Sequence, residues 1–114
     1  MALEHYNIAN NPIDASADRK IVLPLNSDFY QIAIAYSGFT PGAATGFKLN
    51  RSVGTNPTEA SFNLIADSEQ IIADASGTVI YRNEGEERSD FLMLEYTADS
   101  NAVDSIYSII TNNR

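Results

Sequence analysis

The stretch Tyr30-Gln31-Ile32-Ala33-Ile34-Ala35-Tyr36 carries the clearest pattern in the chain. Its large apolar side chains recur at every second position, and successive side chains of an extended strand point to opposite faces. Ile32, Ile34 and Tyr36 are therefore expected to share one buried face. The pattern predicts a β-strand over residues 29–36 that covers a core on one side.

Similar short apolar segments follow one another along the chain, separated by turns of Gly, Pro, Asn and Asp. We expect further strands around residues 20–25, 47–49, 62–66, 71–72, 78–82, 91–96 and 106–110. The segment 91–96 is apolar on both faces and is expected to be central in its sheet, whereas Pro24 suggests an edge strand or a bulge. Together they predict an all-β fold, an antiparallel β-sandwich or jelly roll.

Two interpretations stay open for residues 56–72. The alternation of Phe62 and Leu64 favours strand, while Asn56-Pro57 followed by Glu59 is also a good helix start. We favour strand.

The domain organisation follows from length and turn content. With 114 residues and no cysteine, the chain fits a single domain held together by packing. The breaks at Asn10-Asn11-Pro12 and Asp14–Asp18 predict an extended N-terminal arm over residues 1–18. A single β-sandwich domain is expected over residues 19–114.

The charge of the chain disfavours two classes of partner. Its net charge is −8, from 15 acidic and 7 basic residues, and the basic residues are scattered. Phosphate backbones and anionic lipid would repel such a domain, so we expect no nucleic acid and no membrane as partner. The start Met1–Tyr6 lacks the basic and apolar regions of a secretory signal, and we expect synthesis in a reducing cytosol.

Catalytic chemistry has little support in the sequence. His5 is the one histidine, and a surface or interface position suits it better than a triad. Glu95 interrupts an apolar strand, which fits either a buried acid of raised pKa, or a charge that lies on the half-exposed side of the strand or is paired with Arg82 or Lys48. We favour the second interpretation, and expect neither an enzyme nor a cofactor.

The acidic run from Glu84 to Asp90 is the one weak candidate for a metal site. Glu84, Glu86, Glu87 and Asp90 offer the oxygens that calcium takes, but Arg88 lies among them. A solvated loop is the favoured interpretation, with no metal bound.

Aromatic and apolar residues outside the expected strands are candidates for binding a neighbouring subunit. Phe39 lies in a Gly/Pro loop and Tyr6 in the predicted arm, with Leu3 and Ile8 beside it. Aromatic anchors often dominate interfaces, so we take Leu3, Tyr6, Ile8 and Phe39 as partner-binding candidates. Local packing within the same domain is the alternative for both aromatic residues.

The whole chain resembles the small accessory proteins of bacteriophage virions, the capsid decoration or cement class. The resemblance rests on the arm from Ala2 to Asp18, the cysteine-free acidic β domain, and turn-rich joins such as Asp74-Ala75-Ser76-Gly77-Thr78. It implies a structural protein made in the host cytoplasm and located in the virion, as decoration protein or minor head–tail component. Such proteins bind repeatedly to a regular lattice, often as homo-oligomers, with a trimer favoured.

A second hypothesis belongs to another class. The same fold could be a binding module for carbohydrate or another small ligand, with calcium assisting through the acidic loop. That hypothesis predicts a monomer whose melting temperature rises with calcium or sugar.

Overall fold

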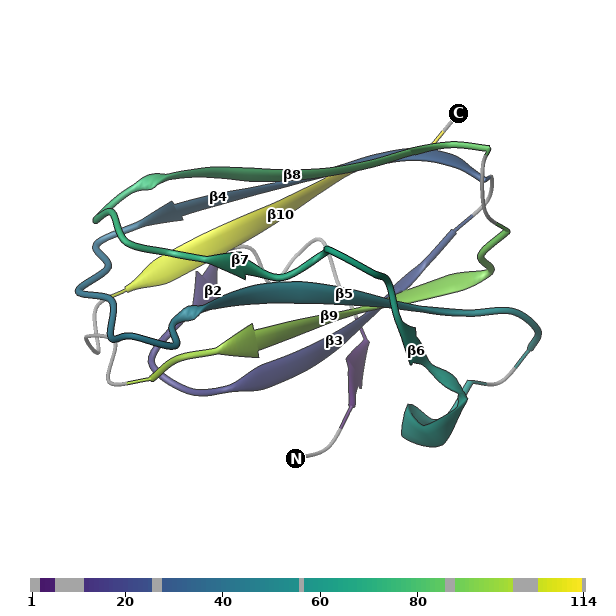
Figure 1. Cartoon of the computed structure of the whole chain (residues 1–114), viewed down its shortest axis with the longest axis horizontal. Coiled ribbons are helices and arrows are strands. Elements are labelled where there is room, and N and C mark those ends of the chain that lie inside the picture. The colour runs from purple at the N-terminus through teal and green to yellow at the C-terminus, as the bar shows by residue number, and fades with distance from the viewer. Residues whose placement is uncertain are drawn as a thin grey trace.

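Two β-sheets packed face to face form the protein, as Figure 1 shows. The computed structural model describes residues 3–5, 12–25, 28–55, 57–85, 88–99 and 105–113. Within these ranges the regular structure is strand, apart from one short 3₁₀ helix. The prediction of an all-β sandwich is therefore confirmed.

The first sheet, sheet A, has six strands and the second, sheet B, has four. Sheet A runs in the order β1 (Glu4–His5), β3 (Arg19–Pro24), β9 (Phe91–Thr97), β5 (Gly46–Ser52) and β6 (Asn63–Leu64), with β7 (Gln70–Ile71) also paired to β5. Sheet B runs in the order β2 (Ile13–Asp14), β10 (Ile106–Asn113), β4 (Phe29–Ser37) and β8 (Gly77–Glu84). In the described part of the chain, every strand pairing is antiparallel except that of β1 with β3.

The strand order is that of a jelly roll. From β2 to β5 successive strands alternate between the sheets, and β8, β9 and β10 alternate again. Strand β9 inserts between β3 and β5, and β10 inserts between β2 and β4. The predicted central position of the segment 91–96 is thus confirmed.

The core lies between the sheets and follows the period-two pattern. In β4 the side chains of Tyr30, Ile32, Ile34 and Tyr36 are buried, as their alternation predicts. Strand β9 supplies Leu92 and Leu94, which are fully buried, from the facing sheet. Five aromatic rings pack together in this core, each within ring-contact distance of another: Tyr36, Phe39, Phe47, Tyr96 and Tyr107.

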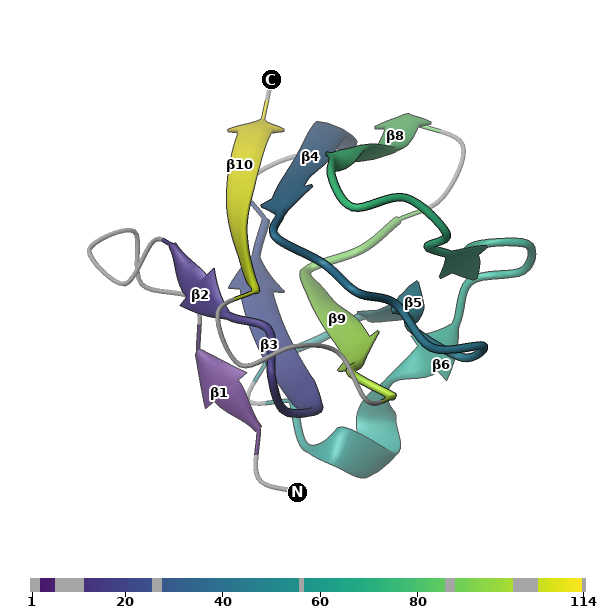
Figure 2. The same ribbon diagram turned by 90° about the vertical axis from the view of Figure 1, so that its left-hand side faces the viewer.

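The predicted N-terminal arm does not stand apart from the domain along its described part. Strand β1 runs beside β3 and β2 runs beside β10, so this segment contributes to both sheets. Figure 2 shows β1 and β2 together at one side of the molecule. Ile13 and Ala15 belong to the core, which therefore extends across the predicted boundary at residue 18.

Residues 57–72 form neither a long strand nor an α-helix. One 3₁₀ turn, η2 (Glu59–Ser61), is followed by the two-residue strands β6 and β7. Between them the Ser68 hydroxyl lies 3.1 Å from both the amide nitrogen and the carbonyl oxygen of Leu49 in β5. The side chain takes the place of a strand partner there. The strands expected around residues 62–66 and 71–72 are present but short, and of the alternative helix only the 3₁₀ turn forms.

Pro24 ends β3 opposite Phe91 and lies beyond the short pairing with β1, which covers Ile21 and Val22. A residue without an amide hydrogen fits this place, because no described strand lies on its outer side.

Candidate interaction surface

Phe39 packs inside its own domain rather than facing a neighbour. Its side chain is 2% exposed, and its ring centroid lies 4.9 Å from that of Tyr36 and 6.1 Å from that of Tyr96. Its backbone N–H also donates to the carbonyl of Ala75 at 3.0 Å. The alternative of local packing therefore holds, and the partner-binding prediction for Phe39 is corrected.

The other candidates of the predicted arm are only partly described. Leu3 is half-buried and packs against a small cluster of Val22, Phe62 and Met93 on the outer side of sheet A. Tyr6 and Ile8 lie outside the described residues, and of His5 only the backbone in β1 is described.

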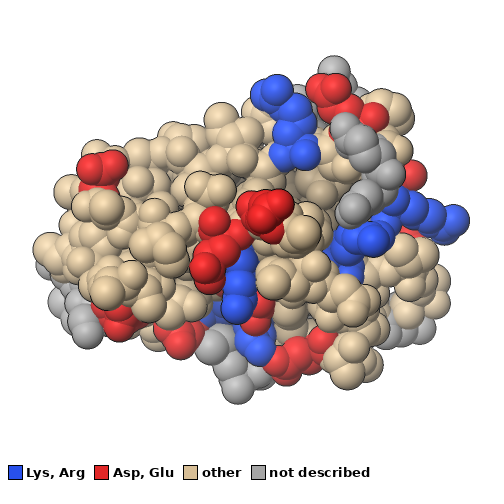
Figure 3. All heavy atoms as spheres, in the orientation of Figure 1, with Lys and Arg blue, Asp and Glu red and all other residues tan. Residues whose placement is uncertain are grey.

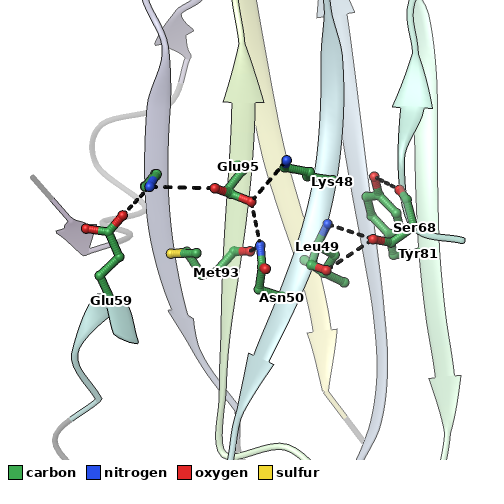
Figure 4. Close-up of polar contacts among 9 residues, drawn as sticks. Lys48, Leu49, Asn50, Glu59, Ser68, Tyr81, Met93 and Glu95 are labelled. Carbon is green, nitrogen blue, oxygen red and sulfur yellow. Dashed lines mark hydrogen bonds and ion pairs between the residues drawn. The ribbon is translucent and has the colours of Figure 1, made fainter. Parts of the chain in front are cut away.

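Two lysines and the glutamate between them form a ladder of alternating charge across the outer side of sheet A. Lys20, Glu95 and Lys48 stand opposite one another in register on β3, β9 and β5. The two lysine Nζ atoms lie 3.7 and 3.8 Å from the Glu95 carboxylate oxygens. Figure 4 shows Lys48 and Glu95 pointing toward each other from neighbouring strands. The pairing of Glu95 with Lys48 was one predicted interpretation and is confirmed, whereas its pairing with Lys20 was not foreseen.

The ladder is completed by two more polar side chains. Asn50 Nδ2 donates to Glu95 Oε2 at 2.9 Å, and Glu59 of η2 pairs with Lys20. The hydrogen bond from Lys20 holds the pKa of Glu59 below its ordinary value and raises that of Lys20. Each of these two carboxylates pairs with at least one lysine. The ladder therefore links β3, β9 and β5 and is not arranged as a general acid.

A hollow beside Glu95 is too small for an ordinary ligand. It is lined by Lys48, Glu69, Ile71 and Thr97 among others, and its empty volume is about 190 Å³, open solvent included. Ligand pockets commonly hold roughly 300–1,000 Å³. Binding of a small organic molecule therefore has no support at this place.

The acidic loop does not bring its described carboxylates together. Asp90 Oδ2 accepts a hydrogen bond from the backbone N–H of Gly54 at 2.6 Å and lies 3.7 Å from Arg88 Nη2. Glu84 is exposed, and Glu86 and Glu87 lie outside the described residues. Among the described residues, no group of three or more His, Cys, Asp or Glu side chains is arranged to hold a metal ion.

The outward side of sheet B is different in character from that of sheet A. Its three long strands present an uncharged set of side chains, which we call the outer B face: Ala33, Ala35, Ser37, Thr78, Ile80, Ile106, Ser108 and Ile110. Arg82 lies beyond this set, where it donates to Gln31 Oε1 at 2.8 Å. In a chain of net charge −8 an uncharged face of this extent is the feature most suited to contact with another molecule.

The centre of the outer B face is an apolar row across three strands. Ile80 of β8 is opposite Ala33 of β4, which is opposite Ile110 of β10. The two isoleucines are 54% and 61% exposed. The sequence holds the signal for this face, because small or apolar residues occupy the outward positions of β4 where polar ones are usual.

Comparison with known proteins adds no relative. No family model, curated protein or solved structure matches the chain. In the described part of the chain, no helix is long and apolar enough to cross a membrane.

Proposed function

We propose that this chain is a structural protein that acts by adhesion, as a capsid decoration or minor head–tail component of a virus particle. The outer B face is the observation that carries the proposal. A surface without charges loses little hydration energy on docking, and its two exposed isoleucines gain from burial.

The size of the outer B face favours repeated binding over a single tight contact. The face extends over five residues of β4, from Ala33 to Ser37, and over three strands, so it measures about 17 by 15 Å, a flat area of about 250 Å². Stable complexes commonly bury about 800 Å² on each partner. One contact is therefore weak, and many identical contacts on a lattice would supply the missing affinity.

The virion as the place of action rests on analogy. Jelly rolls are common among viral capsid domains, and the chain resembles phage decoration proteins in its acidic, cysteine-free make-up. The same fold also occurs in lectins, which keeps the carbohydrate module as the second candidate. That candidate has less support, because Asp90 already accepts a hydrogen bond from the backbone N–H of Gly54 and the hollow beside Glu95 is small.

Co-sedimentation with particles tests the proposal. Virus particles are purified on a density gradient from the source culture, stripped of the chain, and mixed with labelled recombinant protein. We expect the chain in stoichiometric amount on the native particles and saturable rebinding. A chain found only in the soluble fraction, or a melting temperature raised by calcium or a glycan, would overturn the proposal.

Two matched variants locate the contact. Ile110→Lys places a charge in the outer B face, and Leu64→Lys places the same charge on β6 of sheet A at a similarly exposed position. We expect Ile110→Lys to weaken rebinding at least tenfold and Leu64→Lys to leave it unchanged. Equal loss from both would show that net charge, rather than this face, governs binding.

A further inference from the structure

Strand β8 forms an open edge of sheet B. It pairs with β4 along its whole length, and no strand in the described part of the chain pairs with its other side. The hydrogen bond from Gly85 N–H to the Asp28 carbonyl fixes which residues face β4. Because hydrogen-bonded pairs alternate along an antiparallel ladder, the backbone groups of Val79 and Tyr81 point to β4. Those of Thr78, Ile80 and Arg82 point away from it.

The first part of this edge lacks the usual features that prevent strand pairing, since its charged residues, Arg82 and Glu84, lie in the second part. Proline, charged side chains (lysine above all) and bulges commonly protect exposed edges. Residues 77–84 contain neither proline nor lysine, and the register with β4 runs without interruption. In Figure 3 the region over the first part of β8 is largely uncharged, apart from one acidic group at its far left end, and most charges gather elsewhere.

We propose that β8 pairs antiparallel with β8 of a second copy of this chain, about a twofold axis at Ile80. In this register Ile80 faces Ile80 of the other copy, and Thr78 faces Arg82. Shifting the register so that Arg82 lies on the axis would place two like charges opposite each other, which is unfavourable. An intermediate register would place Ile80 opposite Arg82 and leave the isoleucine without an apolar partner.

The pairing extends the outer B face across both copies. The apolar row Ile110–Ala33–Ile80 continues into the same row of the second copy in reverse order, and about six backbone hydrogen bonds join the edges. The combined face covers about 500 Å², twice the area of one copy and closer to the roughly 800 Å² that a specific interface buries on each partner. The dimer would thus offer a larger adhesive surface than the monomer. A role of this dimer in a virus particle rests on the proposed function.

Charge makes the pairing dependent on salt. Each copy has a net charge of −8, so two copies repel one another at long range. The charged groups near the edge are Asp74 before β8, Arg82 within it and Glu84 at its end. Since salt screens the repulsion and the central pair is apolar, we expect the dimer to strengthen as ionic strength rises.

Single cysteines test the geometry directly, because the chain has none. Ile80→Cys places a thiol on the twofold axis, where facing Cα atoms of a hydrogen-bonded pair lie about 5.5 Å apart. Ile110→Cys is the matched control, on the same face but two strands away from the edge. With a short bis-maleimide we expect a cross-linked dimer from Ile80→Cys and none from Ile110→Cys.

Sedimentation equilibrium of the full chain supplies the second measurement, across micromolar to millimolar concentrations. We expect a monomer–dimer equilibrium that Ile80→Lys weakens at least tenfold and Ile110→Lys leaves unchanged. A monomer throughout, a trimer, or cross-linking from Ile110→Cys would overturn the pairing. Particle binding by a strict monomer would leave the proposed function standing, whereas a dimer that binds no particle would refute that function alone.

Discussion

The hydroxyl of Tyr96 donates a hydrogen bond to the carbonyl oxygen of Ala15 at 2.6 Å. Tyr96 belongs to the central strand of sheet A, and Ala15 belongs to the N-terminal segment beside β2. The bond lies in the core, since both residues are buried. It ties the N-terminal segment to the middle of the sandwich and makes this segment part of the fold.

Tyr96→Phe removes this bond, so the buried carbonyl oxygen of Ala15 loses one hydrogen bond. We expect the free energy of unfolding to fall by about 1–2 kcal/mol, measured by urea denaturation. Hydrogen exchange should quicken most at residues 13–15. Tyr81→Phe is the control, since its hydroxyl donates to the Ser68 carbonyl at 2.7 Å in another part of the molecule. Faster exchange at residues 13–15 in both variants would contradict a local role.

Phe39→Ala tests whether this residue belongs to the core. Because Phe39 is buried among aromatic rings, we expect a loss of about 3–5 kcal/mol in the free energy of unfolding. Phe29→Ala is the same change at a half-exposed position of β4 and should cost clearly less. An equally small loss from both would show that Phe39 does not pack as described.

Glu95→Gln removes the negative charge that two lysines share. We expect the free energy of unfolding to fall by about 1 kcal/mol, with a smaller loss in high salt because the ladder is partly exposed. A double-mutant cycle with Lys48→Gln should give a coupling of roughly 0.3–1 kcal/mol. Zero coupling would mean that the two side chains do not interact in solution.

The pair of Lys20 and Glu59 predicts a pH dependence of stability. The pKa of Glu59 is lowered in the folded protein, so its stabilising contribution is complete above its ordinary value of 4.5. The contribution is lost as the pH falls through the folded-state pKa. The pKa of Lys20 is raised, so its contribution is lost only when the pH rises above the ordinary value of 10.5 and through the folded-state pKa.

Comparison of the parent chain with Glu59→Gln isolates this effect. We expect the parent to be more stable at pH 7 and the difference to shrink below pH 4.5, followed by urea denaturation at each pH. Glu69→Gln is the control, since Glu69 is exposed and the described residues give it no ion pair. A difference that is constant from pH 7 to pH 3 would rule out the Lys20 contact as its source.

Period-two alternation sufficed to predict β4, because burial of one strand face is encoded by neighbouring residues. Strands β9 and β10 were predicted from short apolar runs instead. The structure has both, and β10 continues to Asn113, beyond its expected end at residue 110. The candidate site was predicted less well. Leu3 packs against a local cluster and Phe39 lies in the core, whereas the outer B face was not singled out.

The structures of the segment 57–72 and of the N-terminal residues could not be predicted in full from local sequence patterns. Ser68 replaces a strand partner of Leu49, and Ala15 is held by Tyr96, so both contacts join residues distant along the chain. Two-residue strands such as β1 and β2 leave no periodic signal, because their place depends on a neighbouring edge.

The sequence by itself determined the fold class, the strands with one buried face, and the excess of acidic over basic residues. Only the tertiary structure decided which outward faces are covered. Val22 and Met93 are buried beneath Phe62 and Leu3 on sheet A, whereas Ile80 and Ile110 remain exposed on sheet B. All four are apolar residues on outward positions of strands, and their burial depends on which distant segment folds over them.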